Sequence, residues 1–360
     1  MITLDQLRRH AVARTFFTPT TLQRAIERCG FVQADPIRAP ARAQDLTLRH
    51  RVRNYRSGDL ERRYTTLEVE EDTFVNYGFV PRAVHALMHP RDDVSEWPAA
   101  KRRKAEKLLA FVRERGEVHP REVDDHFSHG TVVNFWGGSS NATTHLMDQM
   151  HYAGLLRVVR RDAGIRIYAA RESALPPAAT SAERQERLDA LVDVAIQAYA
   201  PLPAVTLSHL VARLRYAAPQ WTDERKEALR RARARLAHAR VEGVDWFWPA
   251  GERVQAASPP DVARLLSPFD LLVWDRPRFE MLWSWPYRFE AYTPAAKRRL
   301  GYYALPLLWK DRVIGWGNVT VRNGALQCAI GYIASQPPRD RAFKRELEAE
   351  IERIRVFLGL

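Results

Sequence analysis

The middle of the chain carries apolar residues at helical spacing. In the stretch WPAAKRRKAEKLLAFVRERGEVHPREVDDHF, residues Leu108, Leu109 and Val112 form a helical stripe. Gly116 ends this predicted helix and Pro120 opens a second, shorter one, because glycine favours the end of a helix and proline its first turn. The pattern therefore predicts two consecutive helices.

A third helix and a hairpin follow. The stretch SSNATTHLMDQMHYAG places Leu146 and Met150 on one helical face, and Ser139, Ser140 or Asn141 can cap its start. The next residues, LLRVVRRDAGIRIYAA, read as two strands around an Asp-Ala-Gly turn. Helix, helix, helix and hairpin is the order of a winged helix, the helix-turn-helix variant with a β-wing.

The same order recurs, which supports the interpretation more than any single instance does. SAERQERLDALVDVAIQAYA, VTLSHLVARLR and TDERKEALRRARARLAHAR are three predicted helices, and VEGVDWFWPAGE is a candidate wing. Near the N-terminus, TLDQLRRHAVAR and TPTTLQRAIERCG are predicted helices, the second capped by Thr18 and ended by Gly30. We therefore expect three winged-helix units in tandem, the first being the least regular.

After Pro260 the apolar residues alternate in short runs separated by turn residues, which predicts a small antiparallel β-barrel or sandwich. PPRDRAFKRELEAEIERIRVFLGL then closes the chain as an amphipathic helix. The predicted fold class is α+β. The expected parts are winged helices at 1–95, 96–175 and 180–255, a β-barrel at 260–335 and a C-terminal helix at 336–360.

Composition points to a polyanionic partner. The formal net charge is +13, and it is spread through a chain of ordinary apolar content. No apolar run approaches the roughly 18–20 residues that span a bilayer, and the N-terminus lacks the apolar centre of a signal peptide, so we expect a cytoplasmic, DNA-associated protein with no membrane partner. Only Cys29 and Cys328 are present, far apart, which predicts no disulfide, no metal site and no cofactor.

Several basic residues could contact a phosphate backbone. Lys226, Arg230 and Arg233 fall within one sector of a predicted helix, and such a stripe is either a phosphate track or a solvated helix face. Lys297, Arg298 and Arg299 lie between two predicted strands, where they form either a phosphate contact or an exposed turn.

The stretch GTVVNFWGGSSN offers another candidate contact. Backbone amides at the following helix start, with Ser139 and Ser140, could hold a phosphate while Trp136 packs on a sugar or base. The alternative is an ordinary helix cap with Trp136 in the core. Asp148 on the outward face of that helix argues against conventional major-groove reading.

Two polar residues stand in the apolar stretch CGFVQADPIRAP. In a strand, Gln33 and Asp35 share one face, so they either face water, with Asp35 capping the turn at Pro36, or face a substrate. The arginines that follow favour the substrate, because they bring positive charge to that face. A carboxylate in such a basic groove is expected to keep a low pKa and remain anionic, which makes it a candidate for chemistry. These arginines are Arg38, Arg42, Arg49, Arg51 and Arg53, and the first four are predicted DNA contacts.

Here the chain resembles the AlkZ/YcaQ-type winged-helix DNA glycosylases, bacterial enzymes associated with repair of interstrand crosslinks and N7-alkylated purines. The resemblance is carried by GFVQADPIRAPARAQDL, by the central helix–hairpin stretch, and by LLSPFDLLVWDRPRFEMLW with YTPAAKRRLGYYALPLLWKDRVIG, and so covers nearly the whole chain. It implies a C-shaped channel of three winged helices with a small β-barrel. The family's Gln-x-Gln or Gln-x-Asp signature carries onto Gln33 and Asp35. Gln44, where members often have His, and the 70–91 segment depart from the pattern.

The resemblance implies a monofunctional glycosylase that acts on double-stranded DNA containing alkylated or crosslinked purines. Asp35 would stabilise the oxocarbenium ion and assist the attacking water, and Gln33 would hold that water or the sugar. A non-enzymatic winged-helix regulator is the competing hypothesis. Asp148 and the absence of a leucine-rich dimerisation helix argue against it and favour a monomer.

Overall fold

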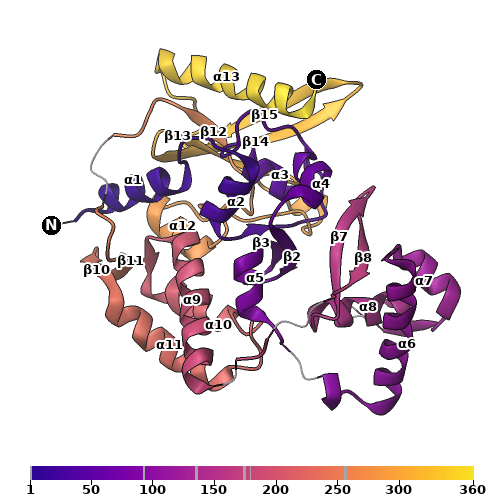
Figure 1. The fold of residues 1–360 in the computed structure, drawn as a ribbon. Helices are drawn as coiled ribbons and strands as arrows, with labels where there is room; N and C mark the ends of the chain where they lie inside the picture. Colours follow the sequence, from indigo (N-terminus) through magenta and orange to yellow (C-terminus); the bar gives the residue numbers. More distant parts are fainter. Residues whose placement is uncertain (1, 92–93, 134–136, 173–175, 179, 255–257) are drawn as a thin grey trace.

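The computed structural model describes residues 2–91, 94–133, 137–172, 176–178, 180–254 and 258–360, and its arrangement is shown in Figure 1. The first part, residues 2–91, combines five short helices with a three-stranded antiparallel sheet of order β1-β3-β2. Its elements are α1 (Leu4–Thr15), α2 (Leu22–Cys29), β1 (Val32–Gln33), α3 (Ala43–Leu48), α4 (Asp59–Arg63), the 3-10 turn Tyr64–Thr66, β2 (Val69–Thr73), β3 (Tyr77–Pro81) and α5 (Arg82–Met88).

The second part, residues 94–172, has its own apolar core, made of residues between Trp97 and Ala170. Its short strand β4 pairs with the hairpin β7–β8 in the order β4-β8-β7. Its elements are the 3-10 turn Val94–Glu96, α6 (Ala99–Arg115), β4 (Glu117–Val118), α7 (Pro120–Phe127), β5 (Thr131–Val133), β6 (Ser139–Asn141), α8 (Ala142–Tyr152), β7 (Leu156–Asp162) and β8 (Ile165–Ala170).

The third part, residues 180–254, repeats this order of elements without the β5–β6 pair, and its sheet has the order β10-β11-β9. Its elements are α9 (Ser181–Tyr199), β9 (Leu202–Pro203), α10 (Ala204–Arg213), α11 (Thr222–Arg235), β10 (Leu236–Val241) and β11 (Val244–Pro249). The predicted helix from Thr222 to Arg240 is therefore too long. Leu236 to Val241 form a strand because they pair in register with the strand that follows.

The C-terminal part is a four-stranded antiparallel sheet, β12-β13-β14-β15, with two helices. In place of the expected small barrel or sandwich, the sheet is an open half-barrel, because its edge strands β12 and β15 do not pair within the described residues. Its elements are β12 (Ala263–Leu265), α12 (Arg276–Trp283), the 3-10 turn Ala295–Lys297, β13 (Leu305–Trp309), β14 (Arg312–Arg322), β15 (Ala325–Tyr332) and α13 (Arg341–Leu358).

Three of the four parts share one apolar core. One apolar core runs through the first, third and C-terminal parts, whereas the second part is packed around a separate core. Figure 1 shows the second part standing to one side, with its β7–β8 hairpin reaching toward β2 and β3. No helix among the described residues is long and apolar enough to cross a membrane.

Several predicted helix boundaries are confirmed. Gly30 ends α2 and Gly116 ends α6, both with positive φ, and Pro120 is the first residue of α7. Asn141, one of the three predicted caps, accepts the Thr144 amide at 2.8 Å at the start of α8. Thr21 caps α2 in place of the predicted Thr18. Local chemistry therefore fixes most helix ends here.

Candidate active site

The stretch around Gln33 is held by a close backbone contact. Strand β1 pairs antiparallel with β3, with Gln33 opposite Gly78, and the amide of Ala34 donates to the carbonyl of Tyr77 at 3.0 Å. A Cβ at residue 78 would lie 2.3 Å from the Val32 carbonyl oxygen, so only glycine allows this approach. The backbone that carries Gln33 is therefore rigidly placed.

The side chain of Gln33 is buried but makes no recorded hydrogen bond with the described residues. Only 6% of the residue is exposed, and its Oε1 atom lacks a donor. A buried polar atom without a partner costs on the order of 1–3 kcal/mol, so such atoms are rare in folded proteins and call for a reason. One such reason is that Oε1 of Gln33 accepts a hydrogen bond from a substrate or a water molecule.

Asp35 both caps a turn and faces a cavity. Its Oδ1 accepts the Ile37 amide at 3.0 Å, and its own amide donates to Oε1 of Gln44 at 3.4 Å. The turn-capping interpretation is thus correct for one carboxylate oxygen. The second oxygen, Oδ2, accepts no hydrogen bond from a described residue and remains available.

The cavity beside Asp35 has a volume of about 120 Å³ and is lined from two parts of the chain. Ala34, Asp35 and Gln44 come from the first part, and Arg161 and Gly164 come from the β7–β8 hairpin of the second. This volume holds several waters but is well below the roughly 300–1,000 Å³ of pockets that enclose small-molecule ligands.

A larger groove of about 750 Å³ adjoins this cavity, since Pro36, Tyr77, Arg161 and Gly164 line both. Asp35 therefore sits in a small recess next to an open groove.

Two expectations about the pair are wrong. Gln33 does not line the cavity that Asp35 lines. Strand β1 ends at Gln33, so the strand alternation that would put both side chains on one face does not extend to Asp35. Burial raises the pKa of the Asp35 carboxyl above its ordinary value, and the Ile37 amide only partly opposes this. The basic surroundings do not give it the expected low pKa.

Two of the predicted DNA-contacting arginines are structural. Arg51 is fully buried, and its guanidinium donates to both oxygens of Asp270 at 2.8 and 3.0 Å. Arg49 is almost as enclosed and donates to Glu350 of α13 at 2.5 Å. Both bind carboxylates of the C-terminal part and present no guanidinium to a duplex, so their predicted role in DNA binding is wrong.

The other two arginines stay near Asp35. Arg38 is exposed, and Arg42 lines the Asp35 cavity. Burial lowers the pKa of Arg42, and the charges of Arg38 and Arg161 lower it further. These guanidiniums therefore concentrate positive charge beside the carboxylate.

The remaining predicted contacts lie outside this cavity. Trp136 falls outside the described residues, and Ser139 and Ser140 belong to strand β6. Basic residues of α11 and of the turn before β13 make local contacts: Arg230 pairs with Glu227, Arg233 donates to Ser208, and the half-buried Arg298 donates to the Thr293 carbonyl. Those that stay predicted DNA contacts are Lys226, Arg230, Arg233, Lys297, Arg298 and Arg299.

Strand β2 holds three buried acidic residues that sequence reasoning missed. Glu70, Glu71 and Asp72 are each at most 2% exposed. Glu71 binds Arg161 through both carboxylate oxygens, so an acid of the first part orients an arginine that lines the Asp35 cavity. Consecutive acids in a strand next to an arginine-rich hairpin are the signal that could have revealed this contact.

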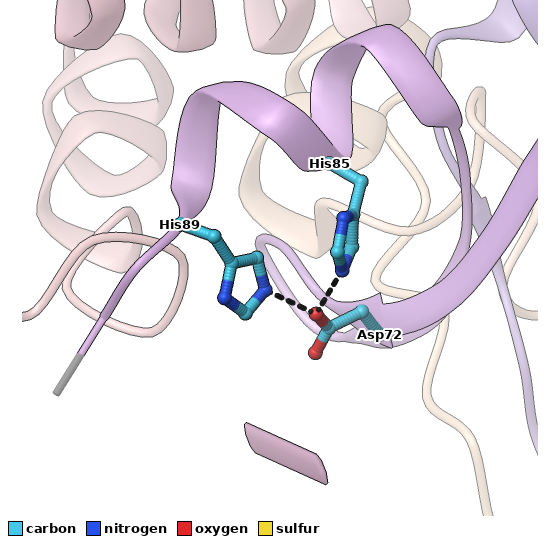
Figure 2. A group of neighbouring side chains, drawn as sticks. All are labelled: Asp72, His85 and His89. Carbon is cyan, nitrogen blue, oxygen red and sulfur yellow. Dashed lines mark hydrogen bonds and ion pairs between the residues drawn. The ribbon is translucent and has the colours of Figure 1, made fainter. Parts of the chain in front are cut away.

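Among the described residues, Asp72, His85 and His89 form a cluster of side chains of the types that bind metal ions (Figure 2). Oδ2 of Asp72 lies 3.0 Å from Nε2 of His85 and 2.9 Å from Nε2 of His89. The other oxygen accepts Arg91 at 2.7 Å. Both histidines are buried, and their i, i+4 spacing is the signal by which the sequence could have revealed the group.

The charge around this group disfavours a cation. Arg91 already neutralises Asp72, and the Arg171 guanidinium lies 3.4 Å from Nε2 of His85. Burial lowers the pKa of His85 to about 3 and of His89 to about 4, so both imidazoles are neutral donors to the carboxylate at pH 7. A divalent ion would add uncompensated charge to a buried site, and we assign the group a structural role.

Chelation is therefore expected to leave the protein unchanged. Dialysis against EDTA should not alter the melting temperature, whereas loss of an ion bound at 100 times its Kd would remove about 2.7 kcal/mol. Elemental analysis with differential scanning fluorimetry, before and after adding Zn²⁺, measures this. Stoichiometric metal whose removal lowers the melting temperature would contradict the assignment.

Comparisons with known proteins agree in the type of protein they indicate. Residues 26–357 match a family model described as "DNA glycosylase AlkZ-like". The fold is similar to the solved structure of Streptomyces sahachiroi DNA glycosylase AlkZ, with a TM-score of 0.64 and 14% sequence identity, over 100% of this chain and 97% of that one.

Proposed function

Because the chain belongs to the AlkZ-like DNA glycosylase family, we propose that it hydrolyses the N-glycosidic bond of N7-alkylated purines in double-stranded DNA, with Asp35 as the catalytic carboxylate. The observation that carries the proposal is the half-buried Asp35, which lies in a water-sized recess beside an open groove and has one oxygen without a partner.

The proposed chemistry needs one carboxylate. A guanine alkylated at N7 is cationic and leaves as a neutral base, so no acid has to protonate it. As the bond from C1′ to N9 breaks, its electrons move to the base, and positive charge develops on the sugar. Anionic Asp35 stabilises that charge and accepts a proton from the water that attacks C1′. Its raised pKa makes it a stronger base for this proton transfer than an ordinary carboxylate.

Gln33 is proposed as the polar partner of the reaction. Its amide offers one acceptor and two donors, and its buried Oε1 is unpaired before substrate binds. We propose that a water molecule or the deoxyribose supplies the missing donor. This role differs from that of Asp35, because Gln33 is not among the residues that line the Asp35 cavity.

The open groove suits a lesion that cannot leave the duplex. Most enzymes that act on a base flip it into an enclosing pocket, and a crosslinked base is tethered to the opposite strand. The small size of the Asp35 cavity and its continuity with the larger groove support attack on a base that remains in the duplex, including unhooking of a crosslink.

The duplex is proposed to run between winged-helix units in a C-shaped channel, with one monomer acting alone. Apart from the extra pair β5–β6 in the second part, the order α6-β4-α7-α8-β7-β8 is repeated as α9-β9-α10-α11-β10-β11, which supports units of this type in the second and third parts. The family match favours an enzyme over a winged-helix regulator.

Activity is expected to fall on the acid side at a pH above the ordinary value for Asp. The carboxylate must be ionised to act, and burial raises its pKa, so kcat/KM is lost as pH falls through that raised value. The midpoint of the acid limb should therefore exceed about 3.9. A pH profile of initial rates, corrected for spontaneous depurination, measures it; a midpoint below that value would contradict Asp35 as the titrating group.

The experiment that tests the proposal uses a duplex carrying a single N7-methylguanine, followed by alkali. We expect strand scission at the lesion and no protein–DNA adduct when borohydride is added, because no lysine lines the described cavity beside Asp35. A borohydride-trapped adduct would refute the proposed mechanism. No scission, together with tight binding to one undamaged sequence, would favour the regulator instead.

A further inference from the structure

A second cavity, of about 410 Å³, lies beside the Asp35 cavity and shares Arg42 and Arg161 with it. Its walls carry four guanidinium groups, from Arg38, Arg42, Arg62 and Arg161. Three of these arginines come from the first part of the chain and Arg161 comes from the β7–β8 hairpin, so the cavity is complete only when the two parts are docked.

Arg42 keeps an unsatisfied donor inside this cavity. Arg42 is about nine-tenths buried, and its Nε atom has no hydrogen-bond partner in the described structure. Burial lowers the pKa of Arg42, and the charges of Arg38 and Arg161 lower it further, which shows that like charges crowd this point. Such crowding destabilises the empty cavity and favours an anion inside it.

Carboxylates pair with three of the four arginines: Glu61 with Arg42, Asp59 with Arg62 and Glu71 with Arg161. Asp45, the other acid of the lining, is bound by the Tyr55 hydroxyl at 2.7 Å and the Gly58 amide at 3.1 Å. Among the described residues, no carboxylate pairs with Arg38, and Nε of Arg42 has no acceptor. These free donors offer a phosphate the fork-shaped geometry that guanidinium presents to its oxygens.

Arg161 is fixed in place for this purpose. Its Nε and Nη2 bind the buried carboxylate of Glu71, and its Nη1 donates to the Gly164 carbonyl at 2.6 Å. A guanidinium held by two partners loses little freedom when a ligand binds. Arg38 and Arg62, by contrast, are exposed. Arg62 donates to Asp59 at 2.6 Å and to the Ser57 carbonyl at 3.2 Å, so Arg38 is the arginine of this cavity that can move onto a ligand without giving up a described ion pair.

We propose that the Arg38–Arg42–Arg62–Arg161 cavity binds one backbone phosphodiester of the damaged strand, close to the sugar that faces Asp35. The proposal rests on the proposed function. The bound phosphate fixes the register of the strand, so that C1′ of the lesion is presented to the carboxylate. It also couples DNA binding to docking of the second part, because Arg161 belongs to that part.

The test is a scan with neutral methylphosphonate linkages. It uses Asp35→Asn protein, so that binding is measured without turnover, and duplexes in which one phosphate at a time around the lesion is neutral. We expect one or two adjacent positions to weaken binding roughly tenfold, as loss of a charged hydrogen-bonded contact does. Binding assays succeed or fail independently of glycosylase activity, which separates this test from that of the proposed function.

A double variant of two exposed arginines, with a neighbouring arginine as control, tests the same contact from the protein side. Arg38→Ala combined with Arg62→Ala should weaken binding to the native duplex and reduce the slope of log K against log salt by about 0.9 for the one phosphate lost. At the sensitive linkage, this double variant should lose no further affinity. Arg63→Ala is the control, because Arg63 is exposed, adjacent and outside the cavity.

The outcomes are distinct. If the double variant and the neutral linkage weaken binding additively, the phosphate lies elsewhere and the proposal is wrong. If no linkage is sensitive and inorganic phosphate, titrated at constant ionic strength, binds wild-type protein but not the double variant, the cavity serves free phosphate and the proposal is also wrong. Non-additive loss confined to one or two linkages supports it.

Discussion

Asp35→Asn is expected to lower the single-turnover rate of base release by about 10²–10⁴-fold, the usual contribution of a positioned acid–base group. Asparagine retains the shape of the side chain and an oxygen that can accept the Ile37 amide, so the turn should survive. It removes the negative charge that faces the developing oxocarbenium ion. The rate is measured with enzyme in excess over a duplex carrying one N7-methylguanine.

The same substitution should stabilise the protein, which excludes misfolding as the cause of lost activity. Burial raises the pKa of Asp35 in the folded state. The folded state therefore binds its proton more tightly than the unfolded state does, and stability is lost as pH rises through this range. At neutral pH the charged side chain costs stability, and Asn removes that cost.

Asp125→Asn is the matched control for Asp35→Asn, because Asp125 is exposed on α7 and lies outside the Asp35 cavity. Its rate should equal that of the wild type. An Asp35→Asn rate within a factor of two of wild type would show that the carboxylate takes no part in the chemistry.

Arg51→Met is expected to cost about 3–5 kcal/mol in the free energy of unfolding, as loss of one partner from a buried ion pair does. Arg51 is fully buried, and it also donates to the backbone carbonyls of Thr15 and Thr47. Without it, the carboxylate of Asp270 remains buried and loses its cation. Urea unfolding followed by fluorescence measures the change.

Arg53→Met supplies the comparison for Arg51→Met. Arg53 is exposed two residues away, so its replacement should change stability by no more than about 0.5 kcal/mol. If Arg51→Met lost no more stability than Arg53→Met, the ion pair between Arg51 and Asp270 would not be what holds the first and C-terminal parts together. DNA affinity of folded Arg51→Met protein should be unchanged, since Arg51 offers no surface to DNA.

Arg51 also shows what the sequence could not reveal. Its position in an arginine-rich stretch after Asp35 suggested a phosphate contact, but its partner Asp270 lies 219 residues further along the chain. Charge density along a chain is a local property, whereas neutralisation is decided by tertiary contacts. Arg38 and Arg49 looked equivalent in the sequence, and only Arg38 is exposed.

Local features were predicted more accurately than distant ones. Gly116 and Pro120 mark helix boundaries because glycine and proline act through their own backbone geometry. The segment after Arg235 was misread because its alanine- and leucine-rich sequence favours a helix, while pairing with strand β11 makes it a strand. Tertiary pairing overrode local propensity at that point.

The candidate site was only half predictable. The sequence singled out Gln33 and Asp35 as polar residues in an apolar stretch, but it gave no sign that Arg161 and Gly164 would line the same cavity as Asp35. These residues arrive through contacts between acids of β2 and arginines of the second part, such as Glu71 with Arg161. Contacts between separate parts of a chain leave no repeating pattern in the sequence, so they cannot be predicted from it.

The most direct test of glycosylase activity is mass-spectrometric detection of free base. Wild-type protein is incubated in excess with a duplex carrying a single N7-methylguanine, and the released base is quantified against the same duplex without the lesion. We expect close to one equivalent of N7-methylguanine per lesion, well above spontaneous loss, and none from the unmodified duplex. Lesion DNA that is bound by the protein while its base stays attached would contradict it.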